Sequence, residues 1–292
     1  LGGTNIRAAI VSEDGTIKCM KKSESHPERG AEAVMETMIS LIESLDGYEE
    51  CEGIGMGIPG PIDTINGKII VSTNLPKLIG FPIAEYVENH FHKPTYMDND
   101  VKVAALGEAV QGAGKDYPIV YYVTISTGVG GALVIDQKVI GGQNGHAGEI
   151  GNICIDRNRE KYNILNVGAV ENEASGTAVT RKGKAVFGDK INHAGDVFDL
   201  ARSGDEQALK IVDDMAYDLA MMFCAIGHII DPHVFVVGGG VMEREKMYSL
   251  EKMESYYRSM IHVGMQPVVF KEALLDEPGI IGAAMLPMTH LK

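Results

Sequence analysis

Hydrophobic and polar positions alternate along this chain in a pattern that predicts strands and helices in turn. Apolar residues at 6–11 and a second strand-like stretch at 16–20 flank a polar turn, which predicts a hairpin. Residues 31–45 then place an apolar face at helical spacing, and Asp46 and Gly47 end the predicted helix. That face consists of Val34, Met38, Leu41, Ile42 and Leu45.

The alternation continues and then restarts in the second half of the chain. Short strands are expected at 53–58 and 94–97, and helices at 83–91 and 101–110. The restart is a strand at 119–126, followed by a long helix at 206–230, a strand at 234–237 and an apolar helix at 279–288. This order predicts two α/β lobes, with the small side chains of the last helix packing back on the first lobe.

A glycine and hydroxyl cluster occurs twice, each time before a strand, a polar turn and another strand. The first copy is Leu1-Gly2-Gly3-Thr4 and the second is Ser126-Thr127-Gly128-Val129-Gly130-Gly131. Glycines let backbone N–H groups converge on an anion, and Thr4, Ser126 and Thr127 add hydroxyl donors. A plain hairpin turn explains either copy alone, but the duplication favours two loops that hold one triphosphate.

Composition narrows the class of protein. The chain has 292 residues, enough for two domains of ordinary size, with 45% hydrophobic and 23% charged residues. Its net charge of −14 weighs against nucleic acid as the main partner, because a phosphate backbone needs a basic face. We therefore expect a globular protein that does not bind nucleic acid.

Cysteine usage and hydropathy point to the cytoplasm. The four cysteines are scattered without C-x-x-C spacing, which is typical of a reduced compartment. No apolar run approaches the roughly 20 residues of a membrane-spanning helix, so no membrane partner is expected. Because the sequence enters the glycine turn at residue 2, we expect the start of the first strand, and an acid for Mg²⁺ there, to precede Leu1.

Several segments, in order, resemble the ROK family, whose name stands for repressors, open reading frames and kinases. They are LGGTNIRAAIV, GIPGPID, MDNDVKVAALGE, TISTGVGGALVIDQKVIGGQNGHAGEIG and IIDPHVFVVGGGV, and the match runs nearly end to end. The resemblance implies a two-lobed actin-like ATPase (ribonuclease H-like) α/β fold with a cleft between the domains. The first lobe is expected at 1–110 with the C-terminal helix 279–292, and the second at 111–278.

The catalytic candidate is Asp100, at a predicted strand-to-helix junction beside Asn99. Phosphoryl transfer to a sugar hydroxyl needs a base, and the resemblance implies that Asp100 deprotonates that hydroxyl, with Asn99 at the sugar site. Taken without the family, Asp100 is also a good N-cap for the following helix.

The resemblance implies two sugar-contacting glutamates, Glu149 and Glu171, and a sugar contact from Thr73, with Asn74 a weaker candidate beside it. The alternatives are a solvated loop charge for Glu149 and a first-turn helix acid for Glu171. The resemblance also implies that adenosine binds at Gly238-Gly239-Gly240. A plain turn after the strand is the alternative for these glycines. ATP and Mg²⁺ are the implied cofactors, and the expected phosphate ligands are Gly2, Gly3, Thr4, Ser126, Thr127, Gly128 and Gly130.

The chain departs from the family at the structural zinc site that most members have. The three cysteine positions hold Tyr162, Ile164 and Ala169, and the histidine position holds Asn152. Because none of these side chains offers a thiolate or imidazole donor, no structural zinc is predicted, and the sugar contacts of Asn152 are open. His146 and Cys154 do not complete a site, and we expect packing of Ile153, Ile155, Tyr162, Ile164 and Leu165 to hold this loop.

The leading hypothesis is an ATP-dependent kinase that phosphorylates the 6-hydroxyl of N-acetylmannosamine, a step in sialic-acid breakdown, since some family members with that activity lack zinc. A glucokinase or another hexose or hexosamine kinase is the alternative substrate assignment. A sugar-responsive repressor without its DNA-binding domain is the alternative of another class. A Rossmann oxidoreductase is excluded, because no strand leads into a G-x-G-x-x-G helix with a ribose-binding acid. Family precedent favours a homodimer.

Overall fold

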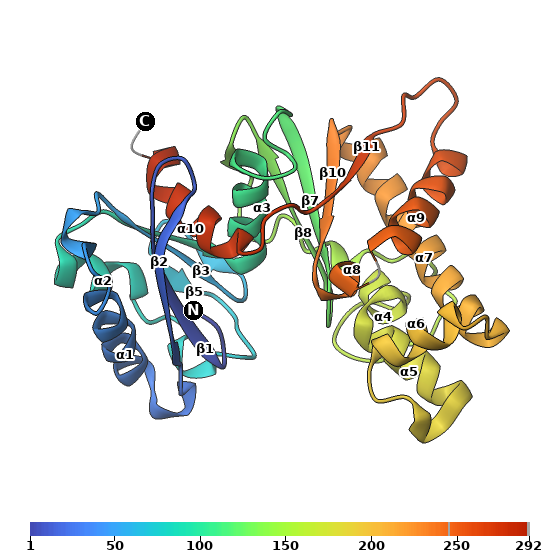
Figure 1. Cartoon of the computed structure of the whole chain (residues 1–292), viewed down its shortest axis with the longest axis horizontal. Coiled ribbons are helices and arrows are strands. Elements are labelled where there is room, and N and C mark those ends of the chain that lie inside the picture. The colour runs from blue at the N-terminus through green and yellow to red at the C-terminus, as the bar shows by residue number, and fades with distance from the viewer. Residues whose placement is uncertain (245, 291–292) are drawn as a thin grey trace. The chain divides into compact units, whose positions relative to one another are not determined.

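The computed structural model describes residues 1–244 and 246–290, and these form two compact units (Figure 1). The first unit contains Leu1–Pro118, Ala132–Ala147 and Leu274–Lys292, and the second contains Ile119–Gly131 and Gly148–Ala273. The sequence-based division placed 111–118, 132–147 and 274–278 in the second lobe instead. The expected C-terminal helix 279–292 is described up to residue 290, so its last two residues lie outside the described range.

The described part of the first unit contains three two-stranded sheets and their covering helices. Strand β1 (Asn5–Val11) pairs antiparallel with β2 (Ile17–Glu24), as the hairpin pattern predicts, and β3 (Ile54–Ile58) pairs parallel with β6 (Thr95–Asn99). Helices α1 (Ala31–Glu43) and α2 (Ile83–Phe91) lie where the sequence predicts them. The third sheet is formed by β4 (Ile62–Asp63) and β5 (Lys68–Ile69), and the further elements are η1 (Pro27–Arg29), η2 (Tyr48–Glu50) and η3 (Pro76–Leu78).

The apolar face predicted for α1 forms part of the first core. Val34, Met38 and Leu41 are buried there, together with Ile6 of β1 and Ile58 of β3. Helix α1 lies along the hairpin in Figure 1 and contacts both of its strands. The hydrophobic spacing of residues 31–45 is therefore explained by burial against β1 and β2.

Helices α3 (Asp100–Val110) and α10 (Pro278–His290) pack with their backbones in close approach. A Cβ on Gly282 would collide with the carbonyl oxygen of Val103, and one on Gly107 would lie 3.0 Å from the Gly282 nitrogen. Only glycine fits at these two positions. The prediction that the last helix packs back on the first lobe is confirmed.

The second unit contains most of a mixed five-stranded sheet, with helices packed against it (Figure 1). Strand β10 (Val234–Gly238) pairs parallel with both β7 (Ile119–Ile125) and β11 (Val269–Glu272), and the start of β8 (Val129–Ile135) neighbours β7. The end of β8 belongs to the first unit, where it pairs with β9 (Lys138–Val139), and the order of the five strands is β11-β10-β7-β8-β9. This single continuous strand explains why a domain boundary read from the sequence missed residues 132–147.

The helices of the second unit include the long one expected at 206–230, which is confirmed at both ends as α7 (Glu206–Ile230). An Asp205 side chain that accepts from the N–H groups of Gln207 and Ala208 starts it. The others are α4 (Val170–Ala174), α5 (Gly176–Phe187), α6 (Ala194–Arg202), α8 (Gly240–Arg244), α9 (Lys246–Met260), η4 (Ile150–Asn152) and η5 (Gly188–Lys190). In the described residues, no helix is long and apolar enough to cross a membrane.

An aromatic cluster fills the core of the second unit. Phe235 of β10 lies 4.9 Å from the ring of Phe223 on α7, 5.1 Å from Phe270 on β11 and 5.9 Å from Tyr257 on α9. Phe235 itself has no exposed surface. Strand β10 thus joins the sheet to both α7 and α9 through one side chain.

We expect Phe235→Ala to destabilise the protein by about 3–5 kcal/mol, because it leaves a cavity and removes the ring contacts with Phe223, Phe270 and Tyr257. Chemical denaturation followed by circular dichroism measures this, since the chain has no tryptophan. Val263→Ala is the control, because Val263 is 94% exposed. A shift as small as that of the control would contradict the role given to Phe235.

Candidate active site

The junction between β6 and α3 carries the predicted base. Asn99 ends β6, and its Oδ1 accepts from the N–H groups of Val101 at 2.9 Å and Lys102 at 3.2 Å. Its Nδ2 donates to the carbonyl oxygen of Gly60 at 3.0 Å. The N-cap of α3 is therefore Asn99, and the alternative that gave this task to Asp100 is wrong.

Asp100 points its carboxylate into open space at the start of α3. It is an exposed residue, and the hydrogen bond to its own carboxylate is a backbone one, from the N–H of Val101 at 3.0 Å. It lines a hollow of about 1010 Å³ within the first unit. Surrounding protein atoms raise the pKa of Asp100 by desolvation, and the Val101 N–H partly offsets this. A carboxylate that water reaches and whose pKa is raised is suited to accept a proton.

The first glycine loop lines the same hollow as Asp100. Gly2, Gly3 and Thr4 all face it, and the Gly2 N–H donates to the carbonyl oxygen of Asn5 at 2.8 Å, which closes the turn. The open edges of β1 and β3 add backbone polar groups to the lining. The first glycine loop and Asp100 are thus neighbours within the first unit.

Gly3 brings the first loop against the segment that holds Thr73 and Asn74. A Cβ on Gly3 would lie 2.9 Å from the Cβ of Asn74, which is closer than real side chains approach. Thr73 and Asn74 are both exposed, in a bend between β5 and η3. Their polar side chains are available to a ligand.

The second glycine loop, Ser126–Gly131, lies in the second unit, against the first turn of α5. The N–H of Gly176 donates to the carbonyl oxygen of Ser126 at 2.8 Å, and Thr177 Oγ1 donates to that of Thr127 at 2.8 Å. Ser175 caps α5 by accepting from the Ala178 N–H at 3.1 Å. Sequence analysis missed Ser175 and Thr177, although a serine before a helical stretch is a known start signal.

Glu171 fits directly onto this loop. Its Oε2 accepts from the N–H of Val129 at 2.9 Å. A Cβ on Gly128 would collide with the same oxygen, and one on Gly151 would lie 3.1 Å from it. At Gly151 the Val129 carbonyl oxygen leaves no room for a Cβ, at 2.4 Å, and Gly128 leaves room for the Glu171 carboxylate. Glu171 is thus more than a first-turn acid.

The other two polar candidates flank η4, beside Gly151. Glu149 is exposed, and its carboxylate has no partner in the part of the chain that the structure describes. Asn152 Oδ1 accepts from the N–H of Asn166 at 2.6 Å, and its carbonyl oxygen accepts from Asn166 Nδ2 at 3.2 Å. Glu149 is free to bind a ligand, whereas Asn152 already joins η4 to the following loop.

The triple glycine also lies next to the second loop. Gly238 pairs with Thr124 at the end of β7, and Gly239 has a φ of +96°. A Cβ on Gly239 would lie 2.6 Å from Thr124 Oγ1, so the turn packs tightly on the end of β7. Gly240 then begins α8. The adenosine and phosphate candidates of the second unit are therefore neighbours at the ends of β7 and β10.

No group of three or more His, Cys, Asp and Glu residues could hold a metal ion among residues 1–244 and 246–290. His146 is exposed, and its Nδ1 lies 2.6 Å from the carbonyl oxygen of Asn144. The expected apolar packing of the loop is wrong in part, because Ile164 is 92% and Tyr162 46% exposed. A cation–π contact holds Tyr162 instead, since the Arg181 guanidinium lies 3.7 Å from the centre of its ring.

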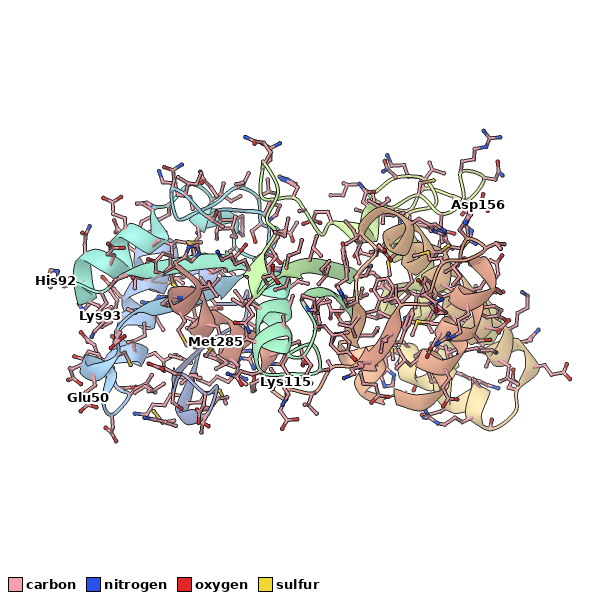
Figure 2. All side chains as sticks on the ribbon, turned by 90° about the horizontal axis from the view of Figure 1, so that it is seen from above. Glu50, His92, Lys93, Lys115, Asp156 and Met285 are labelled. Carbon is pink, nitrogen blue, oxygen red and sulfur yellow. The ribbon has the colours of Figure 1, made fainter. Side chains whose placement is uncertain are left out.

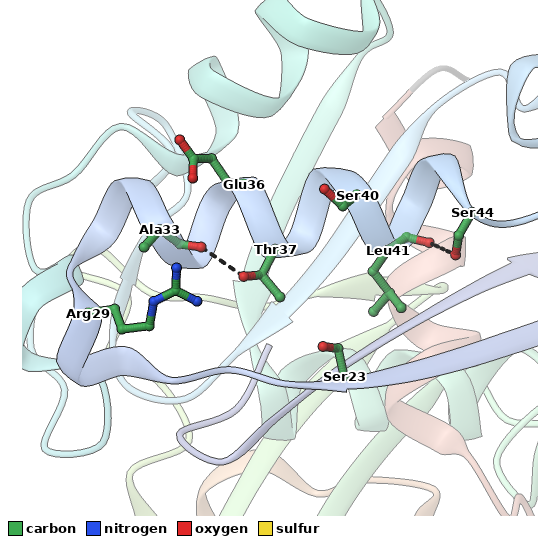
Figure 3. A pocket seen from close by; sticks show the side chains of 8 residues that line it. All are labelled: Ser23, Arg29, Ala33, Glu36, Thr37, Ser40, Leu41 and Ser44. Atoms are coloured by element: carbon green, nitrogen blue, oxygen red, sulfur yellow. Dashed lines mark hydrogen bonds between the residues drawn. The ribbon is translucent and has the colours of Figure 1, made fainter.

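A second hollow, of about 420 Å³, lies between α1 and the end of β2 (Figure 3). Its hydroxyl groups are used within α1: Thr37 donates to the carbonyl oxygen of Ala33 at 2.8 Å, and Ser44 to that of Leu41 at 2.7 Å. It contains none of the candidate residues, which lie around Asp100 in the first unit and around Glu171 in the second.

The amino-acid sequence of this chain is similar to those of known sugar kinases. The sequence model of the ROK family matches residues 1–290. The glucokinase of Thermotoga maritima is 30% identical, over 98% of this chain and 95% of that protein. The N-acetylmannosamine kinase of Yersinia pseudotuberculosis is also 30% identical, over 100% of this chain and 97% of that protein.

Solved structures agree with the fold. The ROK hexokinase from Thermus thermophilus has a TM-score of 0.89 and 29% identity, covering 100% of this chain and 97% of that one. A ROK family glucokinase from Streptomyces griseus, in complex with glucose and AMPPNP, has a TM-score of 0.77 and 27% identity, covering 98% and 96%. The expected fold, the two-domain α/β architecture of actin-like ATPases, is confirmed.

We expect Asn99→Ala to lower the free energy of unfolding by about 1 kcal/mol, because α3 loses its cap. Asn99→Asp keeps an accepting oxygen and is expected to remain close to the wild type. Chemical denaturation of the three proteins measures the difference. Equal stability of Asn99→Ala and the wild type would show that Asn99 is not the cap.

Proposed function

The chain belongs to the ROK family, and we propose that it is an ATP-dependent sugar kinase that phosphorylates the 6-hydroxyl of N-acetylmannosamine. The product would be N-acetylmannosamine 6-phosphate, as in sialic-acid catabolism. The single observation that supports the reaction type best is Asp100: Asn99 caps α3 in its place, so its carboxylate stays exposed, and its pKa is raised.

Asp100 acts as the general base in this proposal. Its carboxylate accepts the proton of the sugar 6-hydroxyl while that oxygen attacks the γ-phosphorus of ATP, and ADP leaves. The Val101 N–H holds the carboxylate in place at 3.0 Å. The amide oxygen of Asn99 accepts from α3 and one Nδ2 hydrogen donates to Gly60, so a single Nδ2 hydrogen remains for a sugar hydroxyl.

The two glycine loops are the proposed phosphate ligands. Backbone N–H groups and hydroxyls of Gly2, Gly3, Thr4, Ser126, Thr127, Gly128 and Gly130 would bind phosphate oxygens. Gly238, Gly239 and Gly240 leave room for adenosine. The residues present fit ATP in chemistry, and Mg²⁺ would neutralise phosphate charge when bound.

The sugar assignment rests on weaker support than the reaction. Glu149 and Glu171 supply carboxylates, and Thr73 and Asn74 supply exposed polar groups, which suit paired hydroxyls on any hexose. The relatives named as a glucokinase and as an N-acetylmannosamine kinase are equally identical to this chain. Glucose or another hexosamine is therefore the rival acceptor.

A coupled ADP-release assay with Mg-ATP tests the function on N-acetylmannosamine, N-acetylglucosamine, glucose and fructose. We expect turnover to be confined to N-acetylmannosamine, and Asp100→Asn to lower kcat by about 10²–10⁴-fold, since the base is lost. Asp116→Asn is the matched control, because Asp116 is exposed, outside the hollow and follows α3.

Other outcomes separate the alternatives. Turnover on glucose instead keeps the kinase and the base but overturns the sugar assignment. No turnover on any sugar, with sugar binding still measurable by calorimetry, overturns the kinase and favours the sugar-responsive repressor.

The raised pKa of Asp100 also predicts a pH dependence. The base must be ionised, so kcat/KM falls as the pH drops through the pKa of Asp100. Because desolvation raises that pKa, we expect the midpoint of the acid limb above about 3.9, the usual value for aspartate. Rates from pH 4 to 8, with circular dichroism to check folding, measure it. A rate independent of pH across that range would contradict the assignment.

A further inference from the structure

The loop at residues 153–169 leaves η4 and returns to α4, and its two ends pair with each other. The N–H of Ile155 donates to the carbonyl oxygen of Gly168 at 2.9 Å, and that of Val170 donates to Ile153 at 2.9 Å. Asn163 and Asn172 exchange side-chain hydrogen bonds at 2.9 and 3.0 Å. The loop is therefore tied to α4 by polar contacts along its length.

A cluster of four charges forms the strongest of these ties. Arg159 Nη1 and Nη2 donate to Asp218 Oδ2 and Oδ1 at 2.6 and 2.7 Å, which is a bidentate pair. Arg159 Nη1 also lies 3.1 Å from Glu173 Oε2. Lys182 Nζ lies 3.2 Å from Glu173 Oε2 and 3.8 Å from Asp218 Oδ2.

Each member comes from a different element of the second unit. Arg159 belongs to the loop, Glu173 to α4, Lys182 to α5 and Asp218 to α7. Asp156, labelled at the surface in Figure 2, lies 3.5 Å from Arg159 Nε on the same loop. The cluster thus joins the loop and three helices at one point.

The charges balance only while Arg159 is present. Asp218 is 1% and Glu173 4% exposed, so both carboxylates are removed from water. Glu173 Oε1 has no hydrogen-bond partner among the described residues, which leaves Oε2 with Arg159 and Lys182. Without Arg159, two buried carboxylates would face Lys182 alone, which is costly.

Helix α4 connects this cluster to the candidate site. Glu171 and Glu173 are two residues apart on a five-residue helix, and Glu171 Oε2 accepts from the Val129 N–H of the glycine loop. Helix α5, which carries Lys182, starts with the residues that bind Ser126 and Thr127. A shift of α4 would therefore move the Glu171 carboxylate.

We propose that Arg159 is a positioning residue, which holds α4 through Asp218 and Glu173 and so fixes Glu171 for sugar binding. The sugar-binding part rests on the proposed function. Arg159 does not touch the Ser126–Gly131 loop in the described contacts. Its effect on catalysis acts through Glu171.

Steady-state kinetics of Arg159→Met test this role. We expect the sugar KM to rise about tenfold or more, since small displacements of a binding group have large effects, with a smaller change in kcat. Partial unfolding alone would lower the apparent kcat and leave KM unchanged. Arg157→Met is the matched control, because Arg157 is exposed and lies on the same loop.

A double-mutant comparison shows whether Arg159 acts through Glu171. Glu171→Gln alone is expected to raise the sugar KM, and adding Arg159→Met is expected to raise it little further. Fully multiplicative effects would overturn the proposal. If Arg159→Met does not fold, Arg159→Lys replaces it, since it keeps the charge but loses the bidentate geometry, and an intermediate KM is expected.

Thermal unfolding tests the cluster without any assay of activity. We expect Arg159→Met to lower Tm more than Arg157→Met does, and Asp218→Asn added to Arg159→Met to recover part of the loss, because it removes an unpaired buried charge. If the wild type phosphorylates no sugar but this pattern holds, the proposed function fails, and the role of Arg159 in holding α4 stands. Equal Tm for both arginine variants, with unchanged KM, overturns that role of Arg159.

Discussion

The hydrogen bond from the Val129 N–H to the Glu171 carboxylate is the contact on which the second unit's site depends. It places a charged side chain directly on a glycine loop, at a position where a Cβ on Gly128 would collide with the carboxylate unless Glu171 moved. The position of the loop therefore depends on the position of α4. The start of α5 then fixes the other end of the same loop through Ser126 and Thr127. Two consecutive helices thus set the geometry of one glycine loop.

In the first unit, the structural role and the chemical role fall to two adjacent residues, Asn99 and Asp100. Asn99 and Asp100 are adjacent residues of similar shape, and either one can cap a helix. Strand β6 ends at Asn99, so its amide oxygen takes the two free N–H groups of α3. Asp100 then enters the first turn with its carboxylate facing the hollow. A neutral amide does the structural work, and the ionisable group remains available for proton transfer.

Local patterns predicted much of this fold from the sequence. The hairpin of β1 and β2, the ends of α7 and the return of α10 to the first unit all follow from spacing and from turn residues. The cap of α3 did not, because the pattern N-D allows two assignments that differ by one residue. The domain boundary near residue 132 did not either, since β8 is one uninterrupted strand that belongs to both units.

The loop at 153–169 is held by contacts that join residues far apart in the sequence. Its apolar residues suggested a small hydrophobic core, but Ile164 is almost fully exposed, and the anchoring pair joins Arg159 to Asp218, 59 residues away. Such a pair leaves no local periodicity. Buried ion pairs add little net stability compared with apolar packing, but their geometry is specific. An ionic anchor therefore suits a loop whose task is to orient α4, because it fixes direction more than it adds free energy of folding.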